Sequence, residues 1–166
     1  MRSGRLGGWL AAGAFVVATG TLAWAFWPSN PAPKPQARHY LNVSACLLTD
    51  PRGIVPGAPG APAWAAMQKA SLATRVMVSY LPDTGTADAP VMLNTLVQRH
   101  CGVIITTGTA ARQVLGVAKA NPRQRFLLIV NPRAAGLATT PNVVIVTAAN
   151  APVRIDQVIH ALAPAA

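Results

Sequence analysis

The feature that most constrains the fold begins at His39, where short apolar runs alternate with helical patterns. Five apolar runs predict strands at residues 40–48, 75–81, 103–106, 125–130 and 142–147. Apolar residues at three- and four-residue spacing predict helices at residues 62–74, 89–100, 110–120 and from 151 onward. Nearly continuous apolar strands separated by amphipathic helices are typical of a parallel sheet covered on both faces. The sequence therefore predicts an α/β fold.

The order of the strands follows from how parallel strands are connected. Crossovers between parallel strands are right-handed, so a doubly wound sheet is the expected topology. We expect a five-stranded parallel sheet with the flavodoxin-like order 2-1-3-4-5. Between the fourth and fifth strands the segment NPRAAGLATTPN carries no helical pattern, which predicts a short or irregular crossover.

The amino-terminal segment from Gly8 to Trp27 has 20 residues without a charge and follows Arg2 and Arg5. Twenty residues in a helix cover about 30 Å, the thickness of a bilayer core. We expect a transmembrane helix at residues 8–27, with residues 1–7 as a basic cytoplasmic tail. The alternative is a cleaved signal peptide, because Ala23-Trp24-Ala25 fits an A-x-A site. The anchor is preferred because the apolar run is longer than a usual signal segment.

Residues 28–38 contain four prolines in eleven residues, which predicts an extended, semi-rigid linker. Residues 39–166 then form a domain outside the cytoplasm. It is held at the cell membrane by the anchor, or secreted if the segment is cleaved.

The chain is strongly basic, with 14 Lys and Arg against 4 acidic residues, a formal charge of +10. Nucleic acid is not the expected partner, because the basic residues are scattered singly and aromatic residues make up only 5%. Contact with anionic lipid or with anionic cell-surface polymers stays open.

A ligand site is expected where the strand order reverses, beyond the carboxyl ends of the first and third strands. There the segment TDPRG follows the first strand and TTGT ends the third. Polar groups and free helix amides at these ends are suited to hold a small ligand, although the same residue types also cap loops and helices. The candidate ligand-binding residues are Thr49, Asp50, Gly53, Thr107, Gly108, Thr109 and Asn131.

Catalysis is not expected, because acid–base chemistry needs two ionisable groups in one pocket. The other acids are Asp83, Asp88 and Asp156, and none of them is expected to form such a pair with Asp50. The three histidines share no metal-ligand spacing. The sequence thus predicts a protein that is not an enzyme and has no catalytic residues, metal or cofactor.

The two cysteines, Cys46 and Cys101, favour a disulfide in an extracytoplasmic setting. Cys46 lies four residues before Asp50 and Cys101 five before Thr106, so both would lie at similar heights on neighbouring strands. The alternative is two separate buried thiols.

The segments ACLLTDPRGI, APAWAAMQKAS, VMVSYL, LVQRHCGVIITTG and ANPRQRFLLIV, in this order, resemble the amino-terminal lobe of the basic membrane protein family. These are periplasmic-binding-protein-like components of ABC transporters, purine nucleoside binders among them. The resemblance covers roughly residues 41–147 and implies roles in ligand contact for Thr49, Asp50, Gly53 and Gly108. The family has two lobes, whereas this chain carries one. Its VPGAPGAPAW segment lacks the polar groups that the family has there.

The expected function is a membrane-anchored, solute-binding-like domain for a small, nucleoside-like ligand. A protein partner or a second copy would supply the missing lobe. The alternative is an interaction or scaffold domain of a cell-envelope assembly that keeps the lobe fold without a ligand.

Overall fold

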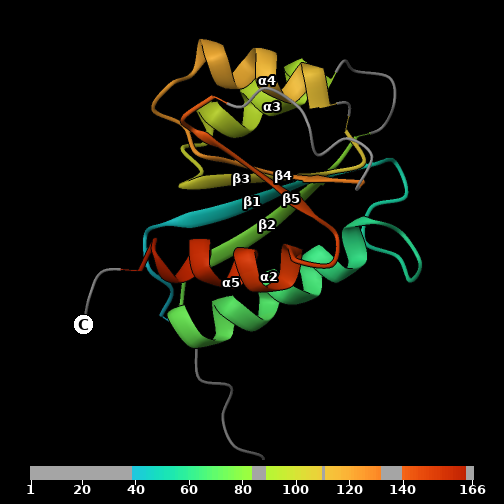
Figure 1. Ribbon diagram of the computed structural model, residues 1–166. Coiled ribbons are helices and arrows are strands. Elements are labelled where there is room, and N and C mark those ends of the chain that lie inside the picture. Colours follow the sequence, from blue (N-terminus) through green and yellow to red (C-terminus); the bar gives the residue numbers. More distant parts are fainter. Residues whose placement is uncertain (1–38, 84–88, 110, 132–139, 164–166) are drawn as a thin grey trace, which may run out of the picture. The chain divides into compact units, whose positions relative to one another are not determined.

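The computed structural model describes residues 39–83, 89–109, 111–131 and 140–163. These residues form five strands and four helices in alternation (Figure 1). In chain order they are β1 Ser44–Thr49, α2 Gly60–Thr74, β2 Met77–Pro82, α3 Ala89–Gln98, β3 Val103–Thr107, α4 Ala111–Ala120, β4 Phe126–Val130, β5 Val143–Thr147 and α5 Ala151–His160.

The strands form one parallel sheet in the order β2-β1-β3-β4-β5, which confirms the predicted α/β topology. β1 pairs with β2 on one side and with β3 on the other, so the strand order reverses at β1. The carboxyl ends of all five strands therefore meet at one edge of the sheet, called the carboxyl edge below. The opposite edge, where the strands begin, is called the amino edge.

Helices cover both faces of the sheet, with α3 and α4 on one side and α2 and α5 on the other (Figure 1). Alternate residues of each strand serve the two faces, because successive side chains of a strand point in opposite directions. Leu48 and Ile104 pack with the core under α3 and α4, whereas Leu47 and Ile105 pack with the core under α2 and α5. Two buried apolar layers explain why the central strands read as continuous apolar runs.

The edge strand β2 is less buried than the prediction of fully covered strands implies. Met77 and Tyr80 are 40% and 43% exposed. The Tyr80 ring meets Trp64 of α2 edge-on, with 5.2 Å between the ring centroids. This exposure is that of an edge strand, because β2 has a neighbouring strand, β1, on only one side.

Several sequence-based predictions fall on residues outside the described ranges. They include the segment from Gly8 to Trp27, the linker at residues 28–38, and most of the crossover between β4 and β5. Among the helices that the structure describes, none has the length and apolar character needed to cross a bilayer.

Cys46 and Cys101 form a disulfide, as predicted, with their Cα atoms 5.9 Å apart. The reason differs from the sequence argument, because the sheet register places Cys46 opposite Ile104 rather than Cys101. Cys101 precedes β3 and lies in the turn that leaves α3, where His100 has a φ of 55°. The bond therefore joins β1 to this turn within the core under α3 and α4.

Candidate ligand site

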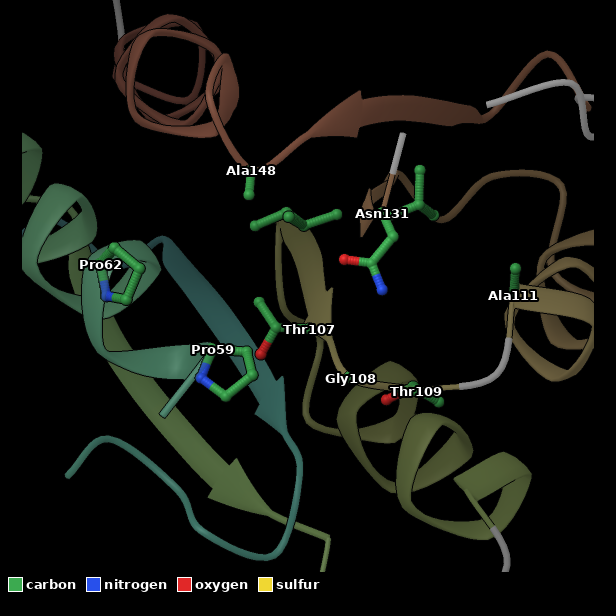
Figure 2. A pocket seen from close by; sticks show the side chains of 10 residues that line it. Pro59, Pro62, Thr107, Gly108, Thr109, Ala111, Asn131 and Ala148 are labelled. Atoms are coloured by element: carbon green, nitrogen blue, oxygen red, sulfur yellow. The ribbon is translucent and has the colours of Figure 1, made fainter. Parts of the chain in front are cut away.

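A cavity of about 330 Å³ opens at the carboxyl edge, beside the ends of β3 and β4 (Figure 2). Its volume lies at the lower end of the range of small-molecule sites. Its lining residues come from the start of α2, the β3–α4 turn, the end of β4 and the turn after β5: Pro59, Pro62, Thr107, Gly108, Thr109, Ala111, Ile129, Val130, Asn131 and Ala148.

Thr107, the last residue of β3, supplies a polar group to this cavity. Its side chain is 1% exposed, and its hydroxyl has no hydrogen-bond partner among the described residues. It lies beside Pro59, on the side of the sheet that α2 covers (Figure 2). A buried hydroxyl without a hydrogen-bond partner destabilises the folded state, so a polar group that entered the cavity and bonded to Thr107 would be stabilised there.

Thr109 and Asn131 add polar groups from two further segments. The Thr109 hydroxyl is also buried without a partner among the described residues, just before α4. Asn131 follows β4, and its amide points toward the space between Thr107 and Thr109 (Figure 2). Gly108, with a φ of 71°, provides the turn that brings Thr107 and Thr109 to the same cavity.

The remaining lining is apolar, and the described lining residues carry no charged side chain. Pro59 and Pro62 form one wall, and Ile129 and Val130 form another. Hydroxyl and amide groups can both donate and accept hydrogen bonds. The arrangement is therefore suited to a neutral, partly apolar molecule with polar edges.

The three candidate residues on the first loop do not line this cavity. Thr49 is fully buried, and its hydroxyl donates to the Asp50 carbonyl over 3.0 Å. The Asp50 carboxylate accepts bonds from the Arg52 backbone N–H and guanidinium, the shortest at 2.9 Å. Gly53, with a φ of 65°, closes the turn by donating to the Asp50 carbonyl. These residues build the β1–α2 loop, which is the capping role considered from the sequence.

The first loop nevertheless reaches the cavity through its later residues. Gly60, at the start of α2, packs so closely that an added Cβ would lie 2.5 Å from the Gly53 carbonyl oxygen. This packing holds Pro59 and Pro62 against the β3 end. The sequence reasoning missed both prolines as lining residues. From the sequence, Pro62 is only the first residue of the helix predicted at residues 62–74.

The described residues contain no group of three or more His, Cys, Asp or Glu side chains arranged to hold a metal. His100 and His160 lie at the ends of α3 and α5, at the opposite edge of the sheet from the cavity. His160 contacts Asp156 within α5, with 3.5 Å between Nδ1 and Oδ2.

Comparison with known proteins shows similarity of fold. No protein-family model matches the chain, and no curated protein matches it. A solved structure described as a "putative lipoprotein from Peptoclostridium difficile 630 (fragment)" is similar, with a TM-score of 0.61 and 17% identity. The match covers 72% of this chain and 97% of that chain. At this identity the likeness supports the α/β fold alone, and the resemblance to the basic membrane protein family remains a hypothesis.

Proposed function

We propose that this chain is a membrane-anchored, extracytoplasmic domain that binds a small, neutral, nucleoside-like molecule at the carboxyl edge. The observation that carries the proposal is the buried Thr107 hydroxyl, which lines the cavity and has no hydrogen-bond partner in the part of the chain that the structure describes. Buried polar groups are nearly always paired, so an unpaired one beside a cavity points to a ligand or water. The anchor is the apolar segment from Gly8 to Trp27.

The chemistry of the lining supports this ligand class over a charged one. Thr107, Thr109 and Asn131 provide polar contacts, whereas Ile129 and Pro59 provide apolar surface. A ligand with a flat apolar body and hydroxyl or amine edges would satisfy both. The lobe that the structure describes covers only one side of such a ligand, so a second lobe that closes the site should strengthen the binding.

The test is a calorimetric titration of the full chain, reconstituted in lipid nanodiscs, against panels of nucleosides and sugars. Thr107→Val removes the hydroxyl with little change in shape and should weaken binding about tenfold. Thr106→Val is the matched control. Thr106 is the neighbouring β3 residue with an equally unpartnered hydroxyl, and it does not line the cavity. No heat at millimolar ligand, or equal losses in both variants, would remove the proposal.

The alternative, a scaffold domain without a ligand, is favoured by a different surface. A groove between α2 and α5 has a largely apolar lining, with Val153 64% exposed, and carries two charged residues, Lys69 and Asp156. Its apolar lining residues are Pro62, Ala65, Ala66, Pro152 and Val153. Exposed apolar surface of this kind is used in protein contacts. Suppose that Val153→Asp abolishes the cross-linking of a partner protein in native membranes, and that no ligand gives a heat in the titration. These two results together would favour the scaffold function over ligand binding.

A further inference from the structure

The amino edge of the sheet collects most of the described basic side chains. Arg75 lies just before β2, and Arg99 lies before β3. Arg123 and Arg125 lie in the turn before β4. Lys119 lies in the last turn of α4, and all five side chains are exposed. The fold therefore gathers charges that the sequence spreads over 50 residues, because parallel strands begin at one edge and their helices end there.

Among the described residues, two of the three aspartates lie at the opposite edge of the sheet. Asp50 and Asp83 follow β1 and β2 at the carboxyl edge. Asp156 lies one turn before the end of α5, where it contacts His160. The amino edge thus carries five basic side chains beside the single carboxylate of Asp156, and a surface with this excess of positive charge attracts polyanions.

Hydrogen bonds hold two of the basic turns in fixed positions. The Gln124 amide donates to the Cys101 carbonyl over 2.9 Å, which ties the Arg123–Arg125 turn to the turn that carries Arg99. The disulfide then fixes that turn to β1. His100 and Arg123 line one open depression of about 690 Å³ between the ends of α3 and α4. Basic side chains in the last turn of a helix offset the negative end of the helix dipole. Arg123 and Arg125 lie beyond the last turn of α4, so this effect does not explain their position.

The chain also enters the domain at this edge. The Leu41 N–H donates to the Arg75 carbonyl over 2.8 Å, and Val43 accepts from Met77 over 3.0 Å. Residues 39–43 therefore run beside the basic surface. The linker at residues 28–38 has eleven residues. Any chain of eleven residues spans at most about 40 Å.

We infer that the amino edge docks onto anionic phospholipid headgroups of the membrane that residues 8–27 cross. In this orientation the carboxyl edge and its cavity face away from the bilayer. The inference rests on the proposed anchor and is independent of whether the cavity binds a ligand. Neutralising a docked cation lowers the ratio of docked to undocked chains about fivefold.

The experiment uses the full chain in nanodiscs of phosphatidylcholine, with or without phosphatidylglycerol. A fluorophore is attached under non-reducing conditions to a third cysteine, and energy transfer to a headgroup-labelled lipid is measured on single discs. Ala120→Cys places the label at the amino edge, and Val55→Cys places it in the β1–α2 loop at the carboxyl edge. We expect stronger transfer from residue 120 in anionic discs, and its loss when salt rises from about 0.05 M to about 0.5 M.

Paired variants separate docking from net charge. Arg123→Gln/Arg125→Gln should lower the docked ratio about 25-fold, from two losses of about fivefold. Arg112→Gln/Arg154→Gln removes the same charge from exposed positions in the first turns of α4 and α5, and should leave the ratio unchanged.

Three outcomes would overturn the inference. Energy transfer from residue 120 that is equal in anionic and neutral discs would show that the anchor holds the domain near the membrane without any contact between the amino edge and the lipid headgroups. Release of the domain by inorganic phosphate at constant ionic strength would identify a free-anion site instead of a lipid surface. A chain that does not enter the discs would remove the membrane as the occupant. A normal ligand titration beside either of the first two results would leave the proposed function standing, whereas the third result would also remove the membrane anchor from it.

Discussion

Asp50 and Gly108 meet so closely that a Cβ on Gly108 would lie 2.9 Å from the Asp50 Cβ. They belong to the two loops that flank the point where the strand order reverses, so the loops touch there and leave no room for a side chain. Gly108 also has a φ of 71°, which glycine adopts without strain. The contact fixes the turn that carries Thr107 and Thr109, and so sets one side of the cavity.

Gly108→Ala should lower the free energy of unfolding by about 1–3 kcal/mol, because it adds both a clash and a strained φ. Gly116→Ala is the matched control. Gly116 lies within α4 with nothing within 4 Å of an added Cβ, and there alanine should stabilise by about 1 kcal/mol. Urea unfolding of both variants measures the difference. Equal effects of the two substitutions would contradict this account of the Asp50 contact.

Thr106→Val and Thr107→Val should each raise the free energy of unfolding by about 1 kcal/mol in the absence of ligand. Both hydroxyls are buried without a partner among the described residues, and valine removes the cost of desolvating them. Thermal unfolding of the ligand-free chain is the measurement. Destabilisation by Thr107→Val would mean that its hydroxyl already has a partner, and the site would lose its main support.

Loss of the disulfide should destabilise the domain strongly. Cys46→Ala/Cys101→Ala opens a loop between residues 55 positions apart and should cost about 2–5 kcal/mol. Ser79→Ala tests the local surroundings, since the Ser79 hydroxyl lies 3.5 Å from the Cys46 sulfur, and it should change stability by less than about 0.5 kcal/mol. A mass consistent with two free thiols in the unreduced chain would refute the bond.

Asn142→Ala should cost about 1–3 kcal/mol, because the Asn142 amide lies within bonding distance of three backbone carbonyls of the α4–β4 turn. These carbonyls belong to Ala118, Asn121 and Gln124. Asn94→Ala is a suitable comparison, since Asn94 is exposed and makes one contact of 3.5 Å to Asn121. Amide hydrogen exchange should show faster opening of residues 118–125 in the first variant alone.

The order of the strands could be predicted because it depends on local hydrophobic patterns, which can be read from the sequence. Apolar runs such as FLLIV alternate with helices such as the one that buries Ile155 and Ile159. Right-handed crossovers then leave few arrangements. Boundaries were less accurate: β1 begins at Ser44 rather than residue 40, since residues 39–43 run alongside the Arg75 turn instead.

The site was predicted only in part. Thr107, Gly108, Thr109 and Asn131 lie together at the cavity, whereas Thr49, Asp50 and Gly53 satisfy one another and Arg52 within their own loop. Both sets follow strands with similar polar residues. What separates them is whether each polar atom finds a partner nearby, and a sequence pattern does not contain that information.

The sequence by itself determined the elements and their order, because hydrophobic periodicity is a local property of the chain. It also favoured a disulfide, because the chain has only two cysteines and each could pair only with the other. The tertiary structure alone decided that Cys101 reaches Cys46 from a turn instead of a paired strand position. It alone decided that the Thr107 hydroxyl finds no partner among the described residues and that scattered arginines share one edge. These outcomes depend on register and on contacts between segments far apart in the chain, where packing rather than local preference sets the positions of atoms.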